Sequence, residues 1–325
     1  MTDDLTDNQR ILQTLQTAHL EFPRDVAFRD ALVEVVDLFR IARDPKRPWG
    51  LGNRVQQRGV FVYAPSGSGK TALVADGLEK FRHPEDGSDL TGRYITVEAP
   101  TPFYTKELLL VILKRLGCDL TDGKEARLAE MVRRRCHELG IFMIHIDEFN
   151  RVNSLKLIGK QAKKTEAKTL GESLASLMTG SDWPLSLVVS GIDHMIALWD
   201  YEVFETAARR VVPFALEPVD DGYRDAMQRV FAFYLTTADC VSELDAKYDL
   251  FGRVRKASLN RLGVMLWYMQ EACIRARRNG DRLVKPAQFA ALYSRISRCG
   301  ANSNLFLEPK WKDISLPAKL EYEKL

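Results

Sequence analysis

One stretch of the chain, residues 60–74, constrains the fold more than any other. An apolar run, VFVY, is followed by APSGSG and then by Lys70 and Thr71. A buried strand that passes through a glycine-rich loop into a helix directs several backbone N–H groups at one point, where the helix dipole favours negative charge. Lys70 is then expected to reach the β- and γ-phosphates of a nucleotide, and the Thr71 hydroxyl to ligate magnesium. The stretch therefore predicts a phosphate-binding loop in an α/β fold.

The loop departs from the usual pattern at its first position, where Ala64 replaces a glycine. Gly67 and Gly69 remain, and they permit the backbone angles and the close approach that a phosphate needs. A glycine- and serine-rich turn that merely precedes a helix is the alternative reading of the same residues. The loop residues predicted to bind nucleotide are Pro65, Ser66, Gly67, Ser68, Gly69, Lys70 and Thr71.

Short apolar runs alternate with helix-length segments through the first two thirds of the chain. This alternation is typical of βαβ units with a buried parallel sheet. After Pro218 the pattern becomes helical, most clearly over residues 258–278. We therefore predict a five-stranded parallel α/β sheet with flanking helices, followed by a small all-helical lid. The predicted strands are residues 59–63, 93–99, 141–146, 185–190 and 211–216.

Breaks in the pattern divide the chain into four predicted segments. They are a helical N-terminal segment (1–54), a nucleotide-binding core (55–217), a helical lid (218–300) and a C-terminal tail (301–325). The tail has no clear period. Its apolar residues either dock a partner or pack on their own domain: Leu305, Phe306, Leu307 and Trp311.

A second motif, IFMIHIDEFN, is an apolar strand that ends in Asp147 and Glu148. The carboxyl ends of strands are where α/β proteins bind their ligands. Asp147 is expected to hold magnesium, and Glu148 to orient and polarise an attacking water. His145, inside the strand, is interpreted as a packed or sheet-edge histidine without a catalytic role.

Two further features fit a nucleotide site. Ser190 ends the strand LSLVVS, where its hydroxyl is expected to touch the γ-phosphate or the water. Arg209 and Arg210 stand just before the last predicted strand, and an arginine supplied across a subunit interface stabilises charge on a transferring phosphoryl group. The sequence does not choose between these two arginines, and a solvated helix end is the alternative reading.

A local basic run is the one indication of nucleic acid, because the net charge of +3 is too small to identify a partner. Four lysines recur at every fourth position, so a helix would carry them as one stripe. Such a stripe suits phosphate contacts that are independent of base sequence. A solvated loop with ordinary lysines is the alternative. The predicted DNA-binding residues are Arg151, Lys156, Lys160, Lys163, Lys164 and Lys168.

The five scattered cysteines include no C-x-x-C pair, which argues against a disulfide framework and a zinc site. No apolar run approaches the roughly 18 residues needed to span a membrane. The polar, acidic N-terminus is unlike a signal peptide. A cytoplasmic protein is expected.

In this order, the motifs resemble an AAA+ ATPase over roughly residues 24–297. Within AAA+, the chain looks most like the transposon-encoded TniB/TnsC group related to MuB and IstB. The features that carry this resemblance are VEAPTPF, IHIDEFNRV, VVSGIDHMIALWDYEVFETAARRVVPFAL and SLNRLGVMLWYMQEACIRA. The sequence RRVV departs from the pattern, in which an arginine followed by phenylalanine is commoner.

The resemblance implies a function. Such ATPases bind ATP and Mg²⁺, assemble as rings or helical filaments around double-stranded DNA, and recruit a transposase and a target-selector protein. Hydrolysis is slow and serves as an assembly and disassembly switch. A lid arginine senses the nucleotide, and Arg261 is the nearest match to it here.

Three alternatives remain open at the level of sequence. The first is an AAA+ helicase loader or replication-initiation ATPase, which the Asp-Glu motif does not distinguish from a transposition regulator. The second is a monomeric P-loop kinase for a small molecule, although no acceptor site is recognisable. The third is an adaptor that binds ATP but barely hydrolyses it.

Overall fold

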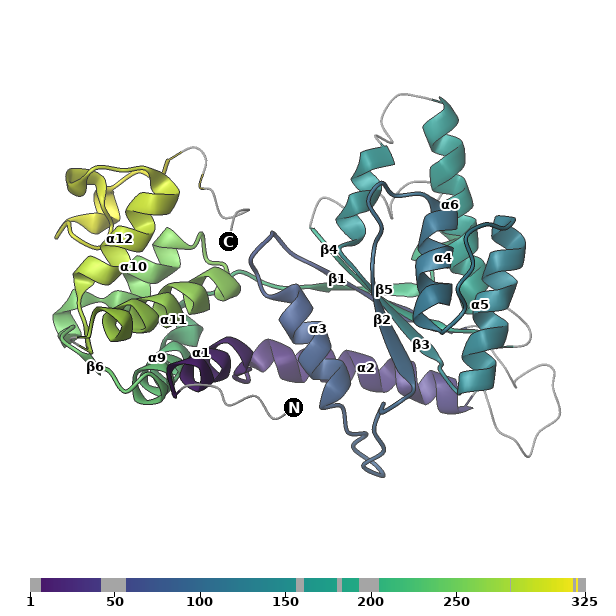
Figure 1. Ribbon diagram of the computed structural model, residues 1–325, viewed down its shortest axis with the longest axis horizontal. Helices are drawn as coiled ribbons and strands as arrows, with labels where there is room; N and C mark the ends of the chain where they lie inside the picture. Colours follow the sequence, from purple (N-terminus) through teal and green to yellow (C-terminus); the bar gives the residue numbers. More distant parts are fainter. Residues whose placement is uncertain are drawn as a thin grey trace. The chain divides into compact units, whose positions relative to one another are not determined.

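The computed structural model describes residues 7–41, 57–155, 161–179, 183–192, 205–280, 282–317 and 320. The chain divides into two compact units. The sheet unit comprises Pro23–Ala64 and Lys70–Leu216, and the helical unit comprises Met1–Phe22, Pro65–Gly69 and Glu217–Leu325. The elements of both units are drawn in Figure 1.

The sheet unit is built on one parallel sheet of five strands in the order β2-β3-β4-β1-β5. Each strand coincides with a predicted run to within two residues at either end, so the predicted α/β sheet is confirmed. β3 and β4 are buried along their whole length, which explains why most of their residues are apolar. The strands are β1 (Gly59–Tyr63), β2 (Tyr94–Glu98), β3 (Met143–Asp147), β4 (Ser186–Gly191) and β5 (Val211–Ala215).

Helices cover both faces of this sheet (Figure 1). Alternate residues of β1 point to opposite faces, so Val60 and Val62 join the core beneath α2 and α3 while Phe61 joins the core beneath α4, α5 and α6. Within the N-terminal segment predicted to be helical, α2 packs on the sheet. The helices are α2 (Pro23–Ile41), α3 (Lys70–Glu79), α4 (Thr105–Arg115), α5 (Glu125–Leu139), α6 (Gln161–Thr179) and α8 (Glu205–Ala208), with a 3₁₀ segment η1 (Phe149–Leu155) after β3.

The helical unit contains α1 from the N-terminal segment together with the C-terminal helices, around a core of large side chains such as Tyr268, Phe289 and Tyr293. The predicted helix over residues 258–278 begins later, at Leu262, because Leu259 and Asn260 adopt left-handed backbone angles. The elements are α1 (Asp7–Thr17), α9 (Arg224–Thr237), α10 (Leu250–Ala257), α11 (Leu262–Asn279) and α12 (Pro286–Ser297), with two short paired strands, β6 (Val241–Ser242) and β7 (Leu283–Val284). The 3₁₀ segments are η4 (Asp221–Tyr223), η5 (Ala246–Tyr248), η6 (Ala301–Ser303) and η7 (Trp311–Asp313).

The C-terminal tail packs on its own unit. Leu305 and Phe306 are buried in the helical core, and Phe306 stacks on Phe289 with ring centroids 5.4 Å apart. Trp311 is buried in the same core, whereas Leu307 is about half exposed. The structure therefore supports the interpretation of the tail as an arm packed on its own domain. The alternative, that Leu305, Phe306 and Trp311 dock a partner, is wrong because these side chains are buried.

Arg253 of α10 ties this tail down, and its removal is expected to destabilise the helical unit. The buried guanidinium donates to the carbonyl oxygens of Tyr248 (2.8 Å), Leu305 and Glu308 (2.9 Å). In Arg253→Met these acceptors lose their partner, which should lower the free energy of unfolding by about 2–3 kcal/mol. Urea denaturation measures the change. Exposed Lys310→Met, in the same tail, is the control and should shift stability by less than about 0.5 kcal/mol.

All five cysteines lie within the described residues and all are free thiols. Cys136, Cys240 and Cys273 are buried, and burial raises the pKa of Cys136 and of Cys273 to about 12. Cys118, in the sheet unit, and Cys299, in the helical unit, are partly exposed. None of the helices in the described part of the chain is both long and apolar enough to cross a membrane.

Candidate nucleotide site

Asp147, the last residue of β3, is the centre of a hydrogen-bonded cluster in the sheet unit. Its Oδ2 accepts from the Thr71 hydroxyl at 2.8 Å, and its Oδ1 accepts from the Ser190 hydroxyl at 2.5 Å. The backbone N–H of Glu148 also donates to Oδ1, at 2.8 Å. Burial acts to raise the pKa of Asp147, but the hydrogen bonds from Ser190, Thr71 and Glu148 outweigh it and the pKa is lowered. The side chain is therefore a carboxylate at neutral pH.

Thr71 and Asp147 fit the ligand set that Mg²⁺ prefers. Both offer oxygen, and the hydroxyl hydrogen of Thr71 is directed at Asp147, which leaves the Thr71 lone pairs for a cation. Mg²⁺ is usually held by one or two protein oxygens together with substrate phosphates and water. The described residues contain no group of three or more His, Cys, Asp or Glu side chains that could hold a metal.

Ser190 and His145 extend the cluster into the sheet. Ser190 is fully buried on β4, and its Oγ lies 2.9 Å from Nε2 of His145. Nδ1 of His145 lies 3.4 Å from the Thr96 hydroxyl on β2. Burial lowers the pKa of His145 to about 4, so the imidazole is neutral at physiological pH. His145 is thus hydrogen-bonded into the site, a role that the sequence analysis missed; its position two residues before Asp147, on the same face of the strand, was the available signal.

Glu148 follows β3 in an unusual backbone conformation, with φ of 55°. A residue other than glycine held in this left-handed region costs roughly 1–3 kcal/mol and is found where the surroundings impose it. Here the chain is anchored on either side by Asp147 and by fully buried Phe149. The half-buried carboxylate accepts a hydrogen bond at Oε2 from Asn150 Nδ2, at 3.1 Å.

The base of the phosphate loop also lies in the sheet unit. Lys70 Nζ donates to the carbonyl oxygen of Ala64 at 2.9 Å, so the ammonium closes the loop across its two ends. The Ala64 methyl is buried in the core with β1 and α3, and Ala64 does not have a positive φ. Its substitution for glycine therefore fits both the packing and the backbone.

The loop residues between Ala64 and Lys70, which are Pro65–Gly69, belong to the helical unit. Gly67 and Gly69 have φ of 77° and 89°, angles that favour glycine. The backbone N–H of Val264, in the first turn of α11, donates to the Gly67 carbonyl at 3.1 Å, and Arg261 donates to the Ser66 carbonyl at 3.1 Å. The predicted lid arginine, Arg261, is thus in contact with the phosphate loop.

The two candidate arginine fingers lie directly before β5. Arg209 is exposed and Arg210 is half-buried. The backbone of Arg210 is fixed by hydrogen bonds from its N–H to Ala207 and from the Gly59 N–H to its carbonyl oxygen. The role of either residue as an arginine finger stays a prediction.

The structure describes only part of the predicted DNA-binding run. Arg151 donates to the Ala99 carbonyl and to Glu98 Oε1 (2.9 Å), so it is tied to the end of β2. Lys168 is exposed on α6, and its Nζ lies 3.8 Å from Oε1 of Glu172. Lys163 and Lys164 also belong to α6, but their side chains are not among the parts that the structure describes. Lys156 and Lys160 lie outside the described residues.

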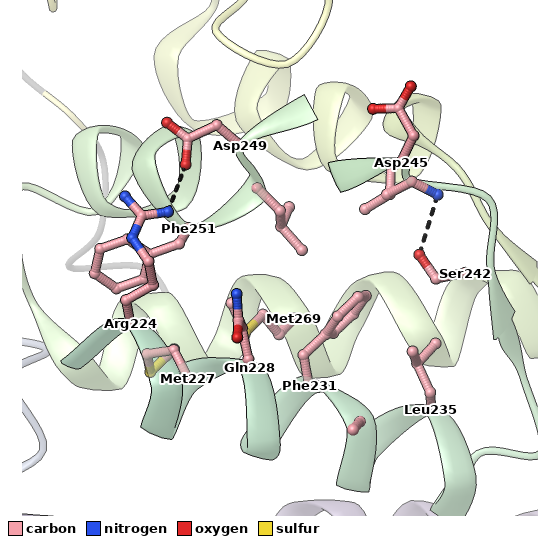
Figure 2. A pocket seen from close by; sticks show the side chains of 13 residues that line it. Arg224, Met227, Gln228, Phe231, Leu235, Ser242, Asp245, Asp249, Phe251 and Met269 are labelled. Atoms are coloured by element: carbon pink, nitrogen blue, oxygen red, sulfur yellow. Dashed lines mark hydrogen bonds and ion pairs between the residues drawn. The ribbon is translucent and has the colours of Figure 1, made fainter. Parts of the chain in front are cut away.

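The helical unit also contains a pocket of about 330 Å³ that the sequence did not indicate (Figure 2). It opens between α9, the loop after β6 and the start of α10, and an ion pair between Arg224 and Asp249 (2.8 Å) lies at one end. No predicted site residue lines it. Most of its lining is apolar, as in Met227, Phe231, Leu235, Leu244, Phe251 and Met269.

Comparison with known proteins agrees with this geometry. Residues 53–194 match the family model described as an AAA domain. No protein of the curated set matches the chain in sequence. The fold together with the phosphate loop and Asp147 defines a P-loop protein of the AAA+ fold, as the sequence analysis predicted.

Three solved structures show how far the likeness extends. The Orc1 protein of Aeropyrum pernix, solved in complex with DNA, is similar with a TM-score of 0.58 and 16% identity over 89% of this chain and 69% of that one. The ORC2 protein of Aeropyrum pernix, solved as ADPNP–ADP complexes, has a TM-score of 0.55 and 11% identity over 88% and 72%. Cdc6p of Pyrobaculum aerophilum has a TM-score of 0.50 and 13% identity over 87% and 70%. At these identities the likeness establishes the fold, and the narrower TniB/TnsC grouping is not established.

Proposed function

We propose that this chain is a Mg²⁺-dependent ATPase that uses its nucleotide as an assembly switch on DNA. The observation that carries the proposal is the arrangement around Asp147, where a phosphate-loop hydroxyl and a buried serine both donate to one ionised carboxylate. A cation site of this kind, beside a lysine at the end of a phosphate loop, suits a nucleoside triphosphate.

Each residue has a role in this proposal. The loop N–H groups and Lys70 bind the phosphates, and Thr71 and Asp147 hold Mg²⁺, which neutralises charge on the transferred phosphoryl group when bound. Glu148 accepts the proton of the attacking water. Arg209 or Arg210 of a neighbouring copy completes the site, and Arg261 relates the occupied loop to α11.

Nucleotide binding tests the proposal directly. The wild-type protein is expected to bind a fluorescent ATP analogue with micromolar or better affinity in the presence of Mg²⁺ and to release phosphate from ATP. Lys70→Ala should lose most of this binding, since the ammonium is the main positive charge of the loop. A wild-type protein that does not bind ATP, or that transfers the phosphoryl group to a metabolite as a monomer, would contradict the proposal.

The DNA part of the proposal rests on the basic run and on the similar Orc1 structure, which was solved with DNA. ATP-dependent binding of double-stranded DNA is expected, with affinity falling by about 10³-fold between 50 and 200 mM salt if the six predicted basic residues contact phosphates. Combined alanine substitution of Lys163, Lys164 and Lys168 should reduce the slope of log K against log salt by about 2.7.

A matched control for this experiment is available on α5. Arg134 is 82% exposed and pairs only with Glu138 of the same helix among the ion pairs of the described chain, so Arg134→Ala removes a surface charge elsewhere. It should leave the slope unchanged. DNA binding that is equal with and without ATP would argue against the switch.

Two cellular roles fit such an ATPase. The TniB/TnsC resemblance favours marking of target DNA and recruitment of a transposase and a target selector. The structural likeness to Orc1 and Cdc6p favours the second candidate, a replication-initiation or helicase-loading ATPase. Purification of the ATP-bound complex on DNA separates them: a transposase as the companion supports the first role, and a replicative helicase supports the second.

A further inference from the structure

The hydrogen-bond chain that ends on Asp147 has only one consistent arrangement of its protons. The Ser190 hydroxyl donates to Oδ1 of Asp147 across a 2.5 Å separation. The Ser190 oxygen then faces Nε2 of His145 at 2.9 Å with a lone pair, so Nε2 carries the hydrogen. The remaining nitrogen, Nδ1, is left as the acceptor for the Thr96 hydroxyl.

We propose that His145 is a positioning residue that commits the Ser190 hydroxyl to Asp147 and thereby sets how tightly the site holds Mg²⁺. The inference rests on the proposed function, in that Asp147 and Thr71 hold the cation. It changes the role expected for Ser190: the hydroxyl anchors the magnesium-holding carboxylate and does not donate to the γ-phosphate.

The physical reason is the freedom of a serine hydroxyl. It has one hydrogen and rotates about its C–O bond, so two nearby acceptors can compete for that hydrogen. A donor placed against the oxygen removes this freedom, because the hydrogen is then directed away from the donor. Nε2–H of His145 is such a donor, and it points the Ser190 hydrogen at Asp147. Ser190, the polar residue near the end of β4, thereby becomes part of the proposed metal site.

The strand geometry makes this arrangement stable. His145 and Asp147 lie on one face of β3, β4 pairs beside it, and β2 pairs on its other side. His145 is 2% exposed and Ser190 is fully buried, so water does not compete for the hydrogen bond between them. Thr96 of β2, His145 of β3 and Ser190 of β4 therefore form a hydrogen-bonded line that ends at the Asp147 carboxylate.

A histidine that only fills space would behave differently on substitution. If His145 only filled space, an apolar side chain of similar shape would leave the Mg²⁺ affinity unchanged. Any loss of Mg²⁺ affinity would also be the same in the wild-type and the Ser190→Ala backgrounds. A positioning role requires that the effect pass through the Ser190 hydroxyl. The two roles are therefore separated by a donor-retaining substitution and by a double-mutant cycle.

The experiment uses the full-length protein and a fluorescent ADP, with binding measured in EDTA and across a Mg²⁺ titration. His145→Phe removes the N–H, and His145→Gln keeps an N–H near the place of Nε2. His145→Asn is a matched partner for the glutamine, since its shorter amide reaches toward Thr96 and not toward Ser190. Met143→Leu, a volume-conserving change in the core of the same strand, controls for disturbance of β3.

The expected results are as follows. His145→Phe and His145→Asn weaken the apparent Mg²⁺ affinity by about tenfold, as the loss of an outer-shell partner does in other metal sites, while ADP affinity in EDTA is unchanged. His145→Gln and Met143→Leu stay within about threefold of wild type. In a Ser190→Ala background, His145→Phe has no further effect.

Equal Mg²⁺ affinity in the glutamine and asparagine variants overturns the inference, as does an undiminished effect of His145→Phe in the Ser190→Ala background. If His145→Phe does not fold, the comparison of Mg²⁺ affinity between His145→Gln and His145→Asn tests the positioning role alone. A wild-type protein whose ADP binding does not respond to Mg²⁺ contradicts the proposed function itself, a result distinct from failure of the His145 inference.

Discussion

Glu148→Gln is expected to reduce steady-state ATP hydrolysis by about 10²–10³-fold while ATP binding stays within about twofold of wild type. A positioned general base contributes roughly 10²–10⁴-fold to a rate, and an amide cannot accept the proton of the attacking water. Glutamine keeps the size and the backbone of Glu148, and its amide oxygen can still accept from Asn150 Nδ2. The loss should therefore appear in turnover and not in binding.

Phosphate release measures turnover, and fluorescence of a labelled nucleotide measures binding. Glu98→Gln is the matched control, because Glu98 lies beside Asp147 at the end of β2 but its carboxylate pairs with Arg151. It should hydrolyse ATP at about the wild-type rate. If Glu148→Gln retains more than a tenth of wild-type turnover, another group activates the water. A wild type that turns over as slowly as Glu148→Gln would instead identify an adaptor that binds ATP without using its hydrolysis.

Gly263→Ala is expected to weaken nucleotide binding by roughly ten- to a hundredfold. A Cβ on Gly263 would lie 2.6 Å from the Gly67 carbonyl oxygen and 3.3 Å from the Gly69 nitrogen, both backbone atoms of the phosphate loop. Neither can move away as a flexible side chain would, so the loop must shift. Overpacking of this kind costs about 1–3 kcal/mol, and 1.4 kcal/mol corresponds to a factor of ten in affinity.

Isothermal titration with ADP and Mg²⁺ gives the affinity of this variant, and circular dichroism verifies its fold. Gly300→Ala, in the same unit, is the control because an added Cβ there meets no atom within 4 Å and its φ of −76° suits alanine. It should bind nucleotide as wild type does. Wild-type affinity in Gly263→Ala would show that α11 shifts in place of the loop, and that the contact with Gly67 is not needed for binding.

Much of the fold could be predicted because its signals are local. The strands predicted at residues 59–63 and 141–146 are mostly apolar, as expected where helices cover both faces of a sheet. The phosphate loop is marked by its own residues. Asp147 could be proposed as a magnesium ligand because a carboxylate directly follows one of these runs.

The parts that could not be predicted depend on contacts between distant residues. The bond from His145 to Ser190 requires that β3 and β4 be neighbours in the correct register. The position of Gly263 against Gly67 joins residues almost 200 positions apart. The start of α11 was placed too early because Leu259 and Asn260, which interrupt the helix, carry no glycine or proline to mark the break.

The distribution of thiols makes the wild-type chain suitable for labelling. Cys136, Cys240 and Cys273 are buried, and the raised pKa of Cys136 and of Cys273 keeps both protonated at neutral pH, a form that reacts poorly with maleimides. Cys118 and Cys299 are partly exposed, one in the sheet unit and one in the helical unit. Two spin labels or a pair of dyes attached there would report the distance between the units by electron paramagnetic resonance or energy transfer. This distance can be compared with and without nucleotide while every residue of the chain is kept.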